Sequence, residues 1–168
     1  MAKTSFDPAH GHICTIAWAA DGEPAQSFHA ETVAQERATV SAFFTQMPSE
    51  TWAKPRFVGH YISGFDIRFI LCRAVVLGVK IPVVFPRDPK PWSESVFDTM
   101  TAWAGARDKI SMNNLCAALG VTGKGDGLDG AQVAQAWADG RHDEIATYCR
   151  DDVDRTRAIH RKFIAAGF

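Results

Sequence analysis

The chain has 168 residues, a length that suits one domain, and we treat residues 1–168 as a single unit. Hydrophobic residues make up 46% of the chain and charged residues 22%, so it can bury a core without staples such as disulfide bonds. The formal net charge of −1 argues against a protein that holds nucleic acid by bulk electrostatics, because such domains are usually strongly basic. It does not exclude an enzyme that binds one nucleic-acid end through metal ions and a short groove.

The first half of the chain combines short extended runs with helical periods. Apolar runs bounded by turn residues predict the strands, and apolar residues at near-helical spacing predict the helices. The expected elements are a loop (1–12), two strands around a turn at Asp21-Gly22 (13–31), a helix (31–47), a strand (56–62) and a largely buried helix (65–79).

The second half is predominantly helical. Ser111 is a suitable helix N-cap, and glycines end the last helices. The expected elements are a strand (81–85), a proline-rich loop (86–95), a segment that fits a strand or a helix start (96–104), helices (111–121, 131–140 and 141–167) and a glycine-rich loop (122–130). Strands come early and helices interleave with them, which predicts an α/β or α+β domain.

The cysteines and the apolar runs bear on the compartment. None of the four cysteines forms a CxxC pair, so we expect reduced thiols at Cys14, Cys72, Cys116 and Cys149. The sequence shows no basic and apolar leader and no apolar run near eighteen residues. We therefore expect no membrane association and a cytoplasmic location, in a bacterium or a phage-infected cell.

The stretch "GHYISGFD" is the first candidate for catalytic chemistry. A buried strand ends here, Gly64 lets the backbone turn, and Asp66 opens a helix. An aspartate at a helix start is also favoured by the helix dipole alone, so a purely structural role fits it as well. Phosphodiester cleavage with two metals needs carboxylates from different elements to converge, and Asp66 could be one of them.

The stretch "YCRDD" is the second candidate. Tyr148 and Asp152 are four residues apart and share one helix face beside the predicted buried stripe. Asp151 is rotated by about 100° from Asp152 and is expected to face solvent. An amphipathic helix with incidental acidic residues would give the same pattern, so this stretch alone does not decide its role.

Together, the two stretches resemble motifs of the DEDD superfamily of 3′–5′ exonucleases, which have the ribonuclease-H-like fold of proofreading domains. "HYISGFD" resembles the second motif, H-N-x-x-x-F-D, and "YCRDD" resembles the tyrosine form of the third, Y-x-x-x-D. The tyrosine subclass includes the proofreading domains of family-B DNA polymerases. "FDTM", "GKGDGLDG" and "YCRDDVDRTRAIHRKF" look like a phage and bacterial group related to those domains. The resemblance covers nearly the whole chain and implies a three-layer α/β fold around a central mixed sheet.

The resemblance implies specific roles for matching residues. Asp66 and Asp152 would be ligands of Mg²⁺ or Mn²⁺, and Tyr148 would orient the attacking water and help to deprotonate it. The implied reaction is hydrolysis of the terminal phosphodiester of DNA, with single-stranded ends favoured. The implied substrate contacts are Phe65, Ser63 and Lys124, and the second-tier site residues are Asp98 and His60. A solvated loop lysine is an equally good interpretation of Lys124.

The sequence departs from the family pattern at two places. Tyr61 stands where the second motif usually has Asn, and no first strand carries the D-x-E of the first motif. Asp21 and Glu23 spell D-x-E, but they fall in a predicted hairpin turn. We therefore expect the fold to lack its first strand, either because the polypeptide starts late or because catalysis has been lost.

This departure has consequences for activity and partners. With Asp66 and Asp152 alone, we expect weak metal binding and little activity from this polypeptide by itself. An uncovered sheet edge invites pairing, so a homo-oligomer or a strand-donating partner is expected. The alternatives that remain open are a non-catalytic module that binds nucleic acid or protein, and an exonuclease acting on RNA, because contacts to the 2′-OH cannot be read from sequence.

Overall fold

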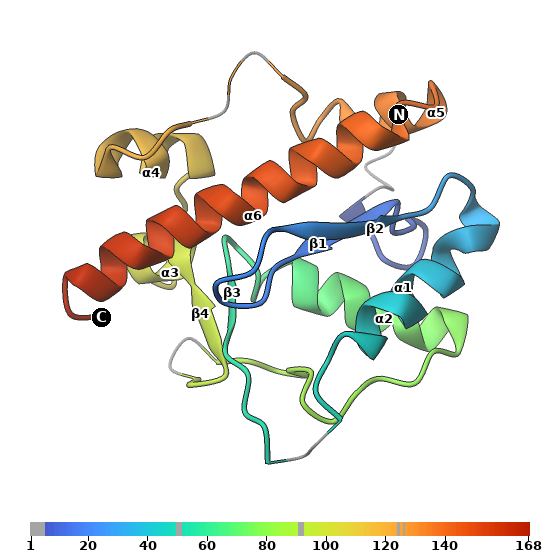
Figure 1. The fold of residues 1–168 in the computed structure, drawn as a ribbon, viewed down its shortest axis with the longest axis horizontal. Coiled ribbons are helices and arrows are strands. Elements are labelled where there is room, and N and C mark those ends of the chain that lie inside the picture. The colour runs from blue at the N-terminus through green and yellow to red at the C-terminus, as the bar shows by residue number, and fades with distance from the viewer. Residues whose placement is uncertain (1–5, 50–51, 91–92, 124, 126) are drawn as a thin grey trace.

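The computed structural model describes residues 6–49, 52–90, 93–123, 125 and 127–168 (Figure 1). Lys124, a predicted substrate contact, lies outside the described residues. The helices and strands, in chain order, are β1 (Thr15–Trp18), β2 (Gln26–His29), a 3₁₀ helix (Val33–Gln35), α1 (Glu36–Thr45), β3 (Phe57–Gly59), α2 (Asp66–Leu77), β4 (Val96–Asp98), α3 (Thr99–Ala104), α4 (Met112–Leu119), α5 (Val133–Ala138) and α6 (His142–Ala165).

The first two strands form the hairpin that the sequence predicts. β1 and β2 pair antiparallel, with Thr15 opposite His29 and Trp18 opposite Gln26. Asp21 and Glu23, which spell D-x-E, are exposed in the connecting turn, as the sequence predicts. The Arg157 guanidinium on α6 donates to the carbonyl oxygen of Glu23 at 2.7 Å and thereby ties the turn to the long helix.

The predicted strand over residues 81–85 is wrong, because this segment forms a turn without a strand partner. Phe85 donates its N–H to the carbonyl of Pro82 at 3.2 Å, which closes the turn. The Phe85 side chain is 3% exposed and packs against the ring of Phe44, with centroids 5.3 Å apart. Of the apolar residues in this segment, Phe85 is buried in the core, whereas Val83 remains exposed.

The segment over residues 96–104, which fitted either a strand or a helix start, contains both. Val96, Phe97 and Asp98 form β4, and α3 starts at Thr99. β4 pairs in parallel with β3, so that Gly59 lies opposite Asp98 at the carboxyl ends of both strands. In a parallel pair these ends are where side chains from successive loops meet.

The predicted helices are present, with shorter ends than the periodicity suggests. The helix expected over 31–47 starts as a 3₁₀ helix with a capping box between Thr32 and Gln35, and only then becomes α1. The predicted Ser111 cap is confirmed, since its Oγ accepts the Asn114 N–H at 3.2 Å.

The strands lie between helical layers. In Figure 1 the long helix α6 runs across one side of the β1–β2 hairpin, and α1 and α2 lie on the other side. Across the described residues, β1–β2 and β3–β4 form separate two-stranded sheets, so the expected single central sheet is not seen there. The protein is a mixed α/β fold, in which α6 contacts both small sheets.

A buried ion pair holds the helices on the far side of the hairpin together. Glu36 of α1 is fully buried, and Arg73 of α2 donates to both of its carboxylate oxygens, with donor–acceptor distances of 2.8 and 2.6 Å. The Ile13 N–H donates to the same carboxylate at 2.8 Å, and Arg73 also donates to the carbonyl of Pro8. This network fixes the segment that leads into β1.

The cysteines and the helices bear on two further expectations, on disulfide bonds and on membrane spans. All four cysteines are free thiols, as the sequence predicts. Among the described residues, no helix combines the length and apolar character needed to cross a bilayer.

Candidate active site

The turn between β3 and α2 is shaped by a carboxylate from the neighbouring strand. Asp98 accepts the backbone N–H of Tyr61 and of Ser63, both at 3.0 Å. The Phe65 N–H donates to the carbonyl of Tyr61 at 3.0 Å and tightens the turn. The chain therefore enters α2 with Asp66 in its first turn, where the helix dipole favours negative charge.

Close packing explains the glycines of this turn. Tyr61 has a φ of 62°, a left-handed conformation that is uncommon for residues other than Gly, Asn and Asp. A Cβ on Gly64 would overlap the Tyr61 ring, and a Cβ on Gly59 would overlap the Ile62 side chain. Asn tolerates the left-handed region better than Tyr does. Tyr61 therefore adopts this conformation at a cost in strain that Asn would reduce.

Asp98, a second-tier prediction, acts here as a scaffold. Its carboxylate is buried and also accepts the N–H groups of Met100 and Thr101, at 3.1 and 3.4 Å, as the N-cap of α3. Together with the two bonds to the β3–α2 turn, these bonds engage both oxygens. Asp98 therefore joins the ends of β3 and β4 and the start of α3.

His60, the other second-tier prediction, has partners on both ring nitrogens. Its Nδ1 lies 3.0 Å from the Thr99 hydroxyl, and its Nε2 lies 3.0 Å from the carbonyl oxygen of Ile110. Burial lowers the pKa of His60, which favours the neutral ring. A neutral ring that donates from Nε2 to the carbonyl accepts the Thr99 proton at Nδ1. The sequence position suggested a site residue, and the structure gives it a bridging role.

Asp66 lies in a field of negative charge. Burial, together with the charges of Asp98 and Asp152, raises the pKa of Asp66 from its ordinary value to about 7. The residue as a whole keeps exposed surface, whereas protein atoms crowd its carboxylate, and we attribute the shift to this local crowding and to the neighbouring charges. The charge of Asp152 therefore acts on Asp66, although the two residues are far apart in the sequence.

Helix α6 presents the residues of the "YCRDD" stretch as its period predicts. Asp151 is exposed, whereas the Asp152 side chain is 27% exposed. The Tyr148 hydroxyl hydrogen-bonds Asp152, and burial and then the Asp152 charge raise the pKa of Tyr148 far above its ordinary value. A Cβ on Gly130 of the glycine-rich loop would lie 3.7 Å from the Tyr148 hydroxyl, so this loop borders the site.

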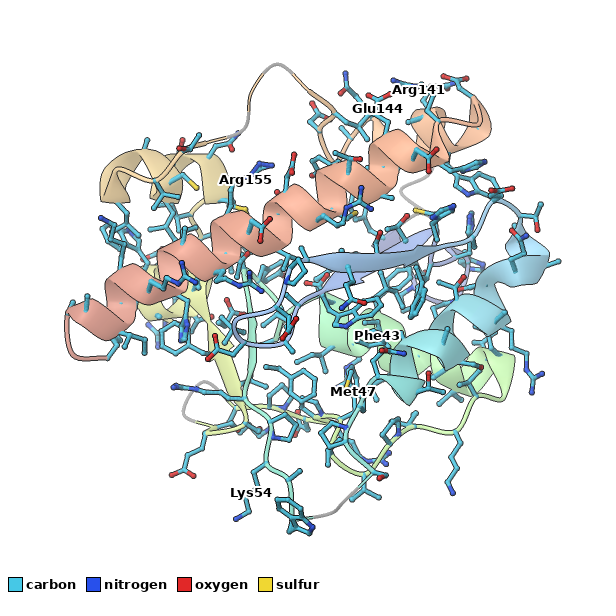
Figure 2. The ribbon with its side chains drawn as sticks, viewed as in Figure 1. Phe43, Met47, Lys54, Arg141, Glu144 and Arg155 are labelled. Atoms are coloured by element: carbon cyan, nitrogen blue, oxygen red, sulfur yellow. The ribbon has the colours of Figure 1, made fainter. Side chains whose placement is uncertain are left out.

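Arg155 is a site residue that the sequence reading missed. Its Nη2 lies 3.5 Å from Asp152 Oδ1, one turn further along α6. Figure 2 shows the Arg155 side chain standing off α6 on the side where α4 lies. The spacing of three residues from an aspartate on a helix is the sequence signal that could have found it.

The carboxylates offer hard oxygen ligands for a small divalent cation. Mg²⁺ is commonly held by one or two carboxylates, with waters and substrate phosphates completing its shell. Asp66 and Asp152 supply oxygen atoms of this kind. In the part of the chain that the structure describes, no group of three or more His, Cys, Asp or Glu side chains is arranged to hold a metal.

The predicted substrate contacts take different places. The Phe65 ring packs against Phe6 and Phe69, with centroids 6.0 and 5.4 Å away, so most of its contacts are with the protein itself. Ser63 lines a hollow of about 430 Å³ together with Asp98, and the hollow is also lined by Arg56 and Lys90.

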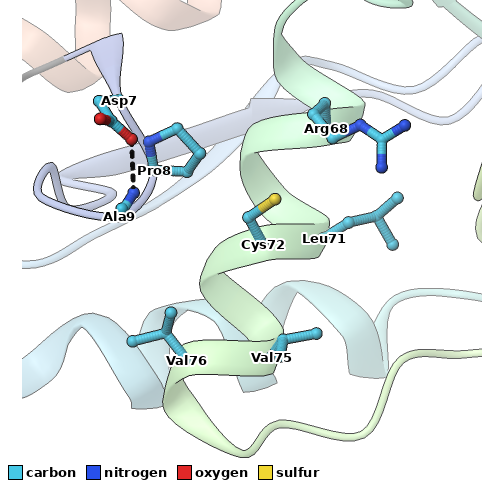
Figure 3. Close-up of a pocket in the computed structure, with 8 residues that line it drawn as sticks. All are labelled: Asp7, Pro8, Ala9, Arg68, Leu71, Cys72, Val75 and Val76. Atoms are coloured by element: carbon cyan, nitrogen blue, oxygen red, sulfur yellow. Dashed lines mark hydrogen bonds between the residues drawn. The ribbon is translucent and has the colours of Figure 1, made fainter.

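A second hollow, of about 390 Å³, lies away from these carboxylates, between α2 and the segment that precedes β1 (Figure 3). Its walls are mostly apolar and include Leu71, Val75 and Val76. Asp7 at its rim accepts the N–H of Ala9 at 2.9 Å and stabilises a local turn. The hollow therefore offers no set of groups suited to phosphodiester chemistry.

Comparison with known proteins identifies the family. No curated protein matches the chain significantly. A family described as a predicted 3′–5′ exonuclease related to the exonuclease domain of PolB matches residues 8–166, which is nearly all of the chain. The match includes both candidate carboxylates, the tyrosine and the glycine-rich loop. The chain therefore belongs to this family of predicted 3′–5′ exonucleases related to the PolB exonuclease domain.

Proposed function

We propose that the protein is a metal-dependent 3′–5′ exonuclease of the tyrosine subclass of the DEDD superfamily, built on a ribonuclease-H-like fold. Its substrate is the terminal phosphodiester of DNA, with single-stranded ends favoured. The observation that carries the proposal is that the Asp152 charge acts both on Asp66 and on Tyr148, in a chain of an exonuclease family. Net charge near zero suits an enzyme that grips one strand end in a short groove.

In this proposal Asp66 and Asp152 hold Mg²⁺ or Mn²⁺. The bound cation would polarise the phosphate and lower the pKa of a coordinated water. Asp98 keeps the β3–α2 turn in place, so it positions Asp66 without itself serving as a ligand. Because only two carboxylates are proposed as ligands, we expect weak metal binding and low activity from this polypeptide alone.

Tyr148 orients the attacking water in this scheme. Its pKa is raised, so its hydroxyl stays protonated at neutral pH in the metal-free protein. A protonated phenol holds a water by hydrogen bonding and is a poor general base. We therefore propose that Tyr148 positions the water and does not act as the base that deprotonates it.

The substrate strand would approach along the hollow beside Ser63. Arg56 and Lys90 supply positive charge in its walls, which suits phosphate groups next to the scissile bond. Phe65 and Lys124 remain proposed substrate contacts, through stacking and phosphate binding respectively.

The choice between DNA and RNA as the substrate is tested with single-stranded DNA and RNA of one sequence. Faster cleavage of the DNA supports the proposal, and faster cleavage of the RNA supports the alternative.

The decisive experiment compares neighbouring aspartates on α6. End-labelled single-stranded DNA is incubated with Mn²⁺ and the wild-type chain, and mononucleotide release is followed. Asp152→Ala should abolish the release, and Asp151→Ala should leave it within about twofold, because Asp151 is exposed and surface substitutions rarely perturb a fold. Equal loss in both variants, or full activity of Asp152→Ala, would refute the assignment.

A second candidate function is a non-catalytic module that binds nucleic acid or protein on an exonuclease fold. The lack of a three-ligand metal group among the described residues favours it. Binding of the labelled DNA without any Mn²⁺-dependent or Mg²⁺-dependent cleavage would support this candidate.

The separate sheets β1–β2 and β3–β4 also leave room for a second copy or a strand-donating partner. Light scattering of the purified chain would reveal such an association as a mass that increases with protein concentration.

A further inference from the structure

Arg155 lies on the same face of α6 as the proposed catalytic residues. Tyr148, Asp152 and Arg155 are separated by four and three residues, which places them in one row on a helix. The Arg155 side chain is only 12% exposed. A guanidinium so little exposed is expensive to keep unless nearby negative charge balances it.

The contact between Arg155 and Asp152 is electrostatic and loose. Nη2 and Oδ1 are 3.5 Å apart, whereas a charge-assisted N–H···O bond is typically about 2.7–2.9 Å long. The Nε of Arg155 is buried and has no hydrogen-bond partner among the described residues. Among the described residues, this guanidinium is therefore held by a charge–charge contact with Asp152.

The field around Arg155 is set by groups from more than one element. Asp152 faces it from its own helix, and the thiol of Cys116 faces it from α4, since the Arg155 charge acts on the Cys116 thiol. The charges of Asp98 and Asp152 both act on Asp66, so these three carboxyl groups share one electrostatic environment. Among the described residues, Arg155 thus places a positive charge beside Asp152, where an added cation would also be attracted.

We propose that Arg155 is a built-in counter-ion that occupies Asp152 in the metal-free protein and that a divalent cation must displace in order to bind. This inference rests on the proposed function, which assigns Asp152 as a metal ligand. An Arg155 that competes in this way weakens metal binding and keeps the carboxylates in place when no metal is present. Removal of its charge should tighten Mn²⁺ binding by about tenfold, because the site loses both a competitor and a repelling charge.

The test measures Mn²⁺ binding directly, with no DNA present. The full chain is titrated with Mn²⁺, and the free ion is followed by electron paramagnetic resonance. Arg155→Gln and Arg155→Met should both bind Mn²⁺ more tightly than wild type, whereas Arg155→Lys, which keeps the charge, should stay near wild type. Circular dichroism melts verify that each variant is folded, and the Met variant retains the aliphatic stem if Gln perturbs the packing.

Arg150 supplies the matched control on the same helix. Its guanidinium donates to the hydroxyl of Ser27 at 2.7 Å and of Thr147 at 3.0 Å, away from Asp152. Arg150→Gln removes the same charge and should change Mn²⁺ affinity by less than twofold. Equal tightening in the Arg150 and Arg155 variants would overturn the proposal, since it would show a general charge effect.

The remaining outcomes separate this proposal from the proposed function. Unchanged or weaker Mn²⁺ binding in both Arg155→Gln and Arg155→Met overturns the counter-ion, even if DNA is cleaved in an Asp152-dependent way. Conversely, tighter binding that Asp152→Ala abolishes supports the counter-ion even if no variant cleaves DNA. If wild type shows no measurable binding, the proposal requires that the uncharged variants do.

Discussion

Replacing Asp98 with alanine tests whether this carboxylate is the scaffold of the candidate site. The wild-type side chain accepts backbone N–H groups on two sides, from the β3–α2 turn and from the first turn of α3. Alanine removes all of these acceptors at once. The turn that leads to Asp66 would then lose its link to β4.

The expected loss of stability follows from the separate bonds. Loss of an N-cap aspartate costs about 1 kcal/mol. The N–H groups of Tyr61 and Ser63 are part-buried, and each buried donor left unsatisfied costs about 1–3 kcal/mol. The total is about 3–5 kcal/mol, because water can reach the turn in part and reduces the larger values.

Urea unfolding followed by tryptophan fluorescence measures this loss. The exposed loop residue Asp108 provides the control, and Asp108→Ala should change the free energy of unfolding by less than about 0.5 kcal/mol. A loss below about 1 kcal/mol for Asp98→Ala, equal to the cap alone, would refute the scaffold role.

The asparagine variant separates a scaffold from a metal ligand. In Asp98→Asn the amide oxygen can still accept from Tyr61, Met100 and Thr101, while the amide nitrogen opposes the Ser63 N–H. We expect a loss of about 1–3 kcal/mol with Mn²⁺ binding retained. Loss of Mn²⁺ binding with little change in stability would instead make Asp98 a ligand.

Three further substitutions test the site and its support. Asp66 has an ordinary pKa of 3.8 and a folded-state pKa of about 7, so between those values the folded protein holds a proton that the unfolded chain has lost, and its stability falls as pH rises. Asp66→Asn should therefore raise Tm at pH 8 and leave it unchanged near pH 4. Gly64→Ala should cost about 1–3 kcal/mol because its Cβ overlaps the Tyr61 ring, whereas Gly123→Ala, with open space around it, should cost nothing. Glu36→Ala should cost about 3–5 kcal/mol because it strands a buried guanidinium.

Each of these three predictions has an outcome that would contradict it. The same rise in Tm at both pH values for Asp66→Asn would show that ionisation is not the cause. Equal melts for the Gly64 and Gly123 variants would mean that the tyrosine ring moves aside freely. A urea midpoint for Glu36→Ala close to wild type would show that water, or a shift of α2, compensates for the lost carboxylate.

The sequence predicted local structural features such as helix faces and caps. It distinguished Asp152 from Asp151, because a helix repeats every 3.6 residues and its hydrogen bonds join near neighbours. The same argument predicted the Ser111 cap and the hairpin around Asp21-Gly22. The sequence-based prediction was wrong at residues 81–85. The apolar residues there fit a strand, but the segment pairs with no strand among the described residues.

The sequence by itself determined which helix faces carry the acidic residues and which glycines sit in tight turns, since both follow from short-range geometry. Only the tertiary structure decided that the Asp152 charge acts on Asp66, that Asp98 holds the turn between β3 and α2, and that Arg155 lies beside Asp152 with little exposure to water. Those contacts join residues that lie far apart along the chain or depend on burial. Their strength depends on how far each group is removed from water, which the packing of the whole fold decides.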